Sequence, residues 1–152
     1  KYLVKPIFGS QGKNIFLVSN LSELRKIKAI GEVFYLQKFI ESQEKEFSDI
    51  RVLVSNHRIV SSMERYSNHF ITNVFQGAKY RQIILKKNIK DLCIKLSKIF
   101  KLGYGGIDLK ITKNDVFVLE INSVPSWKAI QKISKINISE KLVEDFIRNI
   151  KK

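Results

Sequence analysis

Two acidic residues and an asparagine in the second half of the chain are spaced so that three oxygen ligands can lie together. Residues 105–122 read as a hairpin, in which GGIDLKIT and VFVLEIN each alternate apolar and polar side chains around the three-residue loop KND. Both apolar faces must meet one core, and this fixes the parity of the register so that Asp108 lies opposite Glu120, with side chains about 5 Å apart. Two carboxylates that close repel each other unless a cation or a proton lies between them. Asn122 adds a neutral oxygen on the same face, so the pattern predicts a Mg²⁺ site; the alternative is a solvated face on which Lys110 neutralises Asp108.

A short glycine-containing loop follows the first strand-like run of the chain. Residues 8–14 read FGSQGKN, and the preceding run ends at Lys5. Glycines let backbone N–H groups approach phosphate oxygens, and a lysine beside such a loop can act as a point charge on the same phosphates. The loop matches neither G-x-x-x-x-G-K-[ST] nor G-x-G-x-x-G. Taken alone, it is equally compatible with an ordinary flexible turn next to a surface lysine.

A further candidate is the pair Asp49 and Arg51, which share one face of the strand-like run 48–55. An aspartate can hold ribose hydroxyls, and an arginine can form two parallel hydrogen bonds with a phosphate or a carboxylate. The alternative is a simple pair of opposite charges on one strand face.

The composition describes a strongly basic chain that can build a core. Of 152 residues, 44% are hydrophobic, and Lys+Arg outnumber Asp+Glu by 28 to 14, for a net charge of +14. That charge favours a polyanionic partner, either nucleic acid or nucleotide phosphates, or else a solvated lysine surface, since the lysines are spread along the chain. No basic stripe interleaved with aromatic residues occurs, which argues against nucleic acid. No apolar run approaches the roughly 20 residues that cross a bilayer, and the single cysteine, Cys93, fits a small core residue in a reducing cytoplasm.

The elements that would position these residues are strands and hairpins with a few helices between them. The expected strands and hairpins cover residues 1–5, 14–19, 33–40, 48–65 around Asn56-His57, and 105–122. Polar segments without an assigned element cover a charged turn at 41–45 and the stretch 66–81. Three helices are expected: one from a capping box at Asn20–Glu23 to Gly31, one capped by Asn88 and stopped by Gly103, and one capped by Ser139. The pattern predicts an α+β fold with mainly antiparallel sheet.

Two of these helices have a predicted buried stripe. In the second helix the stripe consists of Ile89, Leu92, Cys93, Leu96 and Ile99. In the last helix it consists of Leu142, Val143, Phe146, Ile147 and Ile150.

Six segments, taken in order, resemble the ATP-grasp domain of RimK-type ligases. They are KPIFGSQGK, YLQKFIE, DIRVLV, MERYSNHFITNVFQGAKY, GYGGIDL and VLEINSVPSW, and the resemblance runs from about Lys1 to Ile150. It implies two lobes that grip ATP: residues 1–35 as part of the smaller lobe with its glycine-rich loop, and residues 36–152 as the C-terminal lobe with the magnesium site. It also implies an enzyme in which ATP phosphorylates a carboxylate to an acyl phosphate with release of ADP, and an amine then attacks to form an amide with release of phosphate. Ligases of this type add glutamate to ribosomal-protein tails and to pterin or deazaflavin coenzymes, or modify aminoadipate.

The resemblance also implies a role for each candidate residue. The ATP phosphates would lie against Lys5, Gly9, Ser10, Gln11, Gly12 and Lys13. Adenine would lie, mostly through main-chain contacts, against Gln37, Lys38, Phe39 and Ile40, and the ribose against Asp49. The Mg²⁺ (or Mn²⁺) ligands would be Asp108, Glu120 and Asn122. The phosphates or the acceptor carboxylate would be handled by Arg51, Arg65 and Asn73.

Some positions depart from the family pattern. Ile71 stands where the ribosomal-tail ligases carry an arginine, and HFITN is closer to the aminoadipate and pterin-coenzyme branches; Ser126 replaces a usual glycine. The family also has an N-terminal domain and a further ATP-contacting lysine upstream, so we expect this chain to be part of a longer, cytoplasmic protein that forms a homo-oligomer at full length. The expected partners are ATP, glutamate and an acceptor that the sequence does not identify. The alternatives are a catalytically incomplete fragment and a basic nucleic-acid-binding module.

Overall fold

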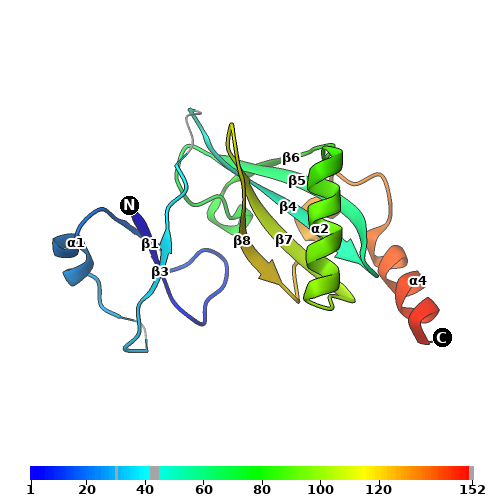
Figure 1. Ribbon diagram of the computed structural model, residues 1–152, viewed down its shortest axis with the longest axis horizontal. Coiled ribbons are helices and arrows are strands. Elements are labelled where there is room, and N and C mark those ends of the chain that lie inside the picture. Colours follow the sequence, from blue (N-terminus) through cyan, green and yellow to red (C-terminus); the bar gives the residue numbers. More distant parts are fainter. Residues whose placement is uncertain (30, 42–44, 151–152) are drawn as a thin grey trace.

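The strands of this protein form two antiparallel sheets, one of three strands and one of five (Figure 1). The computed structural model describes residues 1–29, 31–41 and 45–150. Of the charged turn expected at 41–45, residues 42–44 lie outside this part of the chain. In the described residues, no helix has the length and apolarity needed to cross a membrane.

The small sheet has the order β2-β1-β3 and forms the left-hand lobe in Figure 1. Its strands are β1 (Tyr2–Lys5), β2 (Phe16–Val18) and β3 (Tyr35–Lys38). β3 pairs with β1 from Tyr35 to Lys38, so this sheet continues past the boundary that we expected after residue 35.

The first helix, α1 (Leu21–Arg25), is shorter than predicted. Its expected start is confirmed: the Asn20 Oδ1 accepts a hydrogen bond from the Glu23 N–H at 2.9 Å. Its expected end at Gly31 is wrong, because the helix stops at Arg25. None of its residues is buried, and a short helix without tertiary packing has little to propagate it.

The large sheet has the order β6-β5-β4-β7-β8. Its strands are β4 (Phe47–Ser55), β5 (Arg58–Ser67), β6 (Lys79–Gln82), β7 (Tyr104–Ile111) and β8 (Val116–Asn122). The hairpin predicted around Asn56-His57 is confirmed: both residues have left-handed backbone angles, with φ of 47° and 57°, as a two-residue turn of type I′ requires. The polar stretch 66–81, to which no element was assigned from the sequence, contains most of β6 and a short 3-10 helix, η1 (Val74–Gln76).

Both faces of the large sheet are partly covered by helices. Helix α2 (Lys87–Ile99) lies on one face, where it buries Ile89 and Cys93 against Val52, Ile107 and Leu109. The short α3 (Lys128–Gln131) and α4 (Ile138–Ile150) lie at one end of the opposite face, over a second core that contains Leu53, Met63, Ile130 and Ile138 (Figure 1). The remainder of that face carries the charged residues described below.

The ends of α2 differ from the prediction. Asn88 lies inside the helix, and the N-cap position belongs to Lys86, which makes no side-chain cap. At the other end the helix stops before Gly103, with Lys101 in the left-handed region at φ 50°. The Leu102 N–H donates to the Ser97 carbonyl and the Lys101 N–H to the Lys98 carbonyl, which together form a Schellman motif.

The predicted buried stripes are only partly correct. In α2, Ile99 is 60% exposed because it lies in the last turn, beyond the edge of the core. In α4 the inward face consists of Ile138, Leu142 and Asp145. The other apolar face of α4 is exposed, at 45–67% for its members Val143, Phe146, Ile147 and Ile150. The predicted cap at Ser139 is also wrong, since the Asn137 side chain accepts the Glu140 N–H instead.

Candidate functional site

Four charged residues from three adjacent strands form one buried cluster on the face of the large sheet opposite α2. Asp49 and Arg51 lie on β4, Arg65 on β5 and Asp108 on β7, and the pairing sets Asp49 opposite Arg65 and Arg51 opposite Asp108. Arg51 binds Asp108 at two points, Nε to Oδ1 at 2.8 Å and Nη2 to Oδ2 at 2.7 Å. Arg65 binds Asp49 in the same way, at 2.6 and 2.8 Å. Strand register and opposite charge therefore both determine which residues pair.

Asp108 is held as a carboxylate in this cluster although it is almost fully buried. Its burial favours the neutral acid, but hydrogen bonds from Arg51 and the charge of Arg65 outweigh this and lower the pKa of Asp108. The pKa of Arg65 is raised in turn, because the nearby Asp108 and Asp49 charges outweigh the cost of its own burial. A deprotonated carboxylate is the form that a divalent cation requires.

The predicted position of Asp108 opposite Glu120 is confirmed, although the hairpin reaches it in a different way. The loop has four residues rather than three, with Ile111 opposite Val116, and this shifts the register by one. A bulge between Asp108 and Leu109 then adds a residue on β8 and restores the expected pairing. As a consequence Val118 pairs with Leu109, on the α2 side, rather than sharing the face of Glu120.

The donor set around Asp108 fits a hard divalent cation. Each carboxylate oxygen can accept about two hydrogen bonds. Oδ2 of Asp108 takes one from Arg51 and one from Arg65, whereas Oδ1 takes one from Arg51 and keeps an acceptor position. Glu120, opposite Asp108 on the neighbouring strand β8, is exposed. The Asn122 Oδ1 accepts a hydrogen bond from the Val124 N–H.

Asn122 is needed to complete this donor set. Among the described residues, no group of three or more His, Cys, Asp and Glu side chains is placed to hold a metal ion. Two carboxylates and one amide oxygen, completed by water or phosphate oxygens, match the oxygen-rich and partly hydrated coordination that Mg²⁺ prefers.

Lys5 and Gln37 of the small sheet lie next to the strand that carries Glu120. Burial lowers the pKa of Lys5, while the negative charges of Glu120, Asp108 and Asp49 act in the opposite direction. Its Nζ donates to the Gln37 Oε1 at 2.5 Å, and the Gln37 amide donates at 3.4 Å to the Leu119 carbonyl on β8. Gln37 therefore connects the two sheets.

The segment after Gln37 links the lobes. Lys38 ends β3, and the Phe39 N–H donates to the Lys1 carbonyl at 3.0 Å. The Phe39 ring packs against Phe47 and Phe70 of the large lobe. Ile40, the last member of this predicted set, follows outside any strand.

The glycine-containing loop packs against the turn at residues 71–76. Gly12 has φ +70°, and a Cβ there would lie 3.0 Å from the Ile71 side chain. The Gln76 amide donates to the Gln11 carbonyl at 3.1 Å, and the Lys13 ammonium lies 5.3 Å from the centre of the Phe75 ring. Gly9 and Ser10 lie in the same exposed loop, where the Ser10 carbonyl accepts the Lys13 N–H.

Asn73 and Thr72, in that same turn, hold local structure in this state of the protein. The Asn73 side chain caps η1 by accepting the Phe75 N–H at 2.9 Å. The Thr72 hydroxyl donates to the Asp49 Oδ2 at 2.5 Å, so the turn is tied to the charged cluster. Sequence reasoning missed Thr72, Phe75 and Gln76, because FITNVFQGA mixes polar and apolar residues without a regular period.

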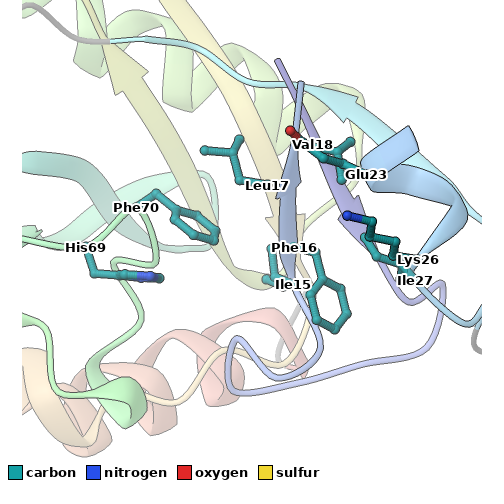
Figure 2. Close-up of a pocket in the computed structure, with 9 residues that line it drawn as sticks. All are labelled: Ile15, Phe16, Leu17, Val18, Glu23, Lys26, Ile27, His69 and Phe70. Carbon is teal, nitrogen blue, oxygen red and sulfur yellow. The ribbon is translucent and has the colours of Figure 1, made fainter. Parts of the chain in front are cut away.

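A separate hollow of about 480 Å³ lies along β2, away from the charged cluster. Figure 2 shows His69 and Phe70 of the large lobe on one side, and Ile15, Phe16 and Leu17 with Glu23 of α1 on the other. None of the predicted site residues lines it. The candidate site therefore rests on the charged cluster and its two flanking loops rather than on this hollow.

Comparison with known proteins gives a family and a set of relatives. The family model of the RimK-like ATP-grasp domain matches residues 2–146. The tetrahydromethanopterin:alpha-L-glutamate ligase of Methanocaldococcus jannaschii is 34% identical over 98% of this chain and 54% of its own length. The coenzyme gamma-F420-2:alpha-L-glutamate ligase of the same organism is 29% identical over 98% of this chain and 52% of its own. The chain thus spans about half the length of the curated relatives that it matches.

Solved structures show the same fold at low sequence identity. A RiPP-associated ATP-grasp ligase of Chryseobacterium gregarium, in complex with ADP, a leader and a core peptide, matches with a TM-score of 0.69 at 18% identity, over 97% of this chain and 48% of that one. A D-alanine–D-alanine ligase of Bacillus anthracis matches with a TM-score of 0.66 at 15% identity, over 97% and 53%. The predicted α+β architecture of the ATP-grasp type is confirmed.

Proposed function

Because the chain belongs to the RimK-like ATP-grasp family, we propose that it carries the nucleotide- and metal-binding part of an ATP-dependent carboxylate–amine ligase. The observation that carries this proposal is the convergence of both lobes on one point. Asp108 and Glu120 face each other on the large sheet, and Lys5 of the small sheet is joined through Gln37 to the Leu119 carbonyl beside Glu120. An acidic pair with a lysine near it, and a glycine-containing loop that packs on the turn bonded to Asp49, suits a magnesium–nucleotide complex, in which cation and phosphates neutralise both sides.

In this proposal the chain's own residues mainly bind and orient. Lys5 and the loop Gly9–Lys13 hold the phosphates, the Gln37–Ile40 segment receives adenine, and Asp49 lies on the ribose side. Asp108, Glu120 and Asn122 hold Mg²⁺ or Mn²⁺, which when bound draws charge away from the phosphate oxygens. The proposed chemistry therefore depends on positioning and charge neutralisation rather than on a nucleophile supplied by the protein.

We further propose glutamate as the amine substrate. Support comes from the curated relatives, which include glutamate ligases from two archaeal coenzyme systems at 29% and 34% identity. The sequence HFITN, which is closer to the coenzyme and aminoadipate branches, favours a small-molecule carboxylate as the acceptor over a ribosomal tail.

An ADP-release assay tests this function directly. The protein is incubated with MgATP, glutamate and a panel of carboxylate acceptors, and product is identified by a mass gain of one glutamyl residue. Stoichiometric ADP and amide product support the proposal. ADP release that is independent of glutamate and of every acceptor would contradict it.

A thermal-shift comparison separates the ligase from the basic binding module. The expected result is stabilisation by MgATP, with less by ATP plus chelator and none by single-stranded DNA. Stabilisation by DNA alone would favour the nucleic-acid-binding alternative.

A further inference from the structure

Arg65 is the most enclosed cation of the charged cluster, and it joins two carboxylates from two different strands. Its side chain is 5% exposed, against 13% for Arg51. Besides its two bonds to Asp49, its Nη2 donates to the Asp108 Oδ2 at 2.9 Å. Among the described residues, Arg65 is therefore the side chain that hydrogen-bonds to both Asp49 and Asp108.

The donors of Arg65 are largely used within the protein. A guanidinium has five N–H donors in a fixed fork. The Nε hydrogen and both Nη2 hydrogens are taken by Asp49 and Asp108, which leaves only Nη1 on a buried side chain. An arginine that grips a phosphate at two points needs two donors on an accessible edge, and Arg65 does not present such an edge.

The same bonds determine which oxygen of Asp108 can take a metal. Arg51 and Arg65 both donate to Oδ2, so that oxygen has no acceptor position left. Oδ1 keeps one position, and the register places Asp108 opposite Glu120. Without the Arg65 bond, Arg51 would still hold both oxygens, but Oδ2 would regain an acceptor position and either oxygen could take the metal.

We propose that Arg65 is a positioning residue, which orients Asp108 for the metal and ties it to Asp49 without touching the nucleotide. This inference rests on the proposed function. It replaces the role that resemblance suggested for Arg65, namely a direct contact with phosphates or with the acceptor carboxylate.

The two roles predict different dependences on metal, which titration calorimetry with ADP can separate. The affinity for ADP is measured with Mg²⁺ and with chelator, in the original protein and in Arg65→Lys. Lysine keeps the charge but lacks the planar fork that binds Asp49 at two points while a third N–H reaches Asp108. A positioning role predicts that the affinity with chelator changes less than twofold, whereas the enhancement by Mg²⁺ falls about 10- to 100-fold, as for other partners of metal ligands. Arg81→Lys is the matched control, because Arg81 pairs with Glu64 at the surface and should leave both affinities unchanged.

Equal losses with and without Mg²⁺ in Arg65→Lys would overturn the inference, because they indicate a direct contact with the nucleotide. Absence of any ADP binding in the original protein would overturn the proposed function, and the inference with it.

A measurement on the original protein covers the case in which Arg65→Lys fails to fold. The Nε–H resonance of Arg65 should be protected from exchange and unmoved by ADP plus chelator, and should shift when Mg²⁺ is added. A shift caused by metal-free ADP of the same size would contradict the positioning role.

Discussion

At the scale of single residues, the site is a set of charges ordered by strand register. Asp49 with Arg65 and Arg51 with Asp108 are cross-strand partners, and Glu120 adds a further charge opposite Asp108. Alternation in the sequence predicted that Asp49 and Arg51 share one strand face and that Asp108 lies opposite Glu120, whereas Arg65 was suggested only by the family resemblance. Alternation could not predict that two arginines would occupy the carboxylates, because hydrogen-bond partners across three strands depend on the sheet order.

The predicted metal ligand Glu120 can be tested by removing its charge alone. Glu120→Gln keeps the shape of the side chain but weakens the attraction for a divalent cation, so Mn²⁺ affinity in the presence of ADP should fall at least about tenfold. Electron paramagnetic resonance of free Mn²⁺ measures this. Glu140→Gln, in the exposed first turn of α4, is the control and should have no effect. Unchanged Mn²⁺ affinity in Glu120→Gln would remove Glu120 from the ligand set.

Cys93 provides a test of the α2 core. It is fully buried, and burial raises the pKa of its thiol to about 11, so the reactive thiolate is scarce at pH 7 to 8. We expect almost no reaction with a thiol reagent in the native protein and a stoichiometric reaction in denaturant. Rapid labelling of the native protein would show that α2 does not pack against the sheet as described.

At the scale of elements, strand pairing was predicted better than helix ends. The two hairpins followed from alternation and from Asn56-His57. The end of α2 was misplaced because Gly103 is the stronger sequence signal, whereas the left-handed position is occupied by Lys101, a residue type that seldom adopts it. For α4, both sides of the helix are apolar, so the pattern alone could not decide which one faces the core.

The Schellman motif predicts a stabilising substitution. Lys101→Gly relieves a left-handed backbone at φ 50° and should raise the free energy of unfolding by about 0.5–1 kcal/mol. Urea denaturation with an unchanged m-value is the measurement. Lys98→Gly, inside the last turn of α2, is the matched control and should lower stability by about 1 kcal/mol. Destabilisation by Lys101→Gly would mean that the helix ends differently.

The contact between the glycine loop and the turn at 71–76 can be tested at Gly12. An alanine there is strained at φ +70° and would press on the Ile71 and Asn73 side chains at 3.0 and 3.1 Å. We expect Gly12→Ala to weaken nucleotide binding several-fold. Gly31→Ala meets the same backbone strain at φ +64° but open space, so it controls for the conformational cost. Equal effects of the two substitutions on binding would show that the contact with the turn is unimportant.

At the scale of the whole molecule, the proposed function depends on two lobes that meet through a few polar and aromatic contacts. The bridges are the Lys5–Gln37–Leu119 chain, the Phe39 ring and the loop contact at Gln76. The overall α+β architecture was predictable because hairpin signals and family motifs occur in order along the chain. The way the lobes meet was not predictable from alternation, because it depends on side chains that reach across from separate sheets.

Joint binding of magnesium and nucleotide between the lobes can be measured by hydrogen–deuterium exchange with MgADP. We expect simultaneous protection of residues 9–13 in the small lobe and residues 116–122 in the large lobe, lost when the metal is chelated. Protection confined to one lobe, or protection that persists fully with chelator, would contradict it.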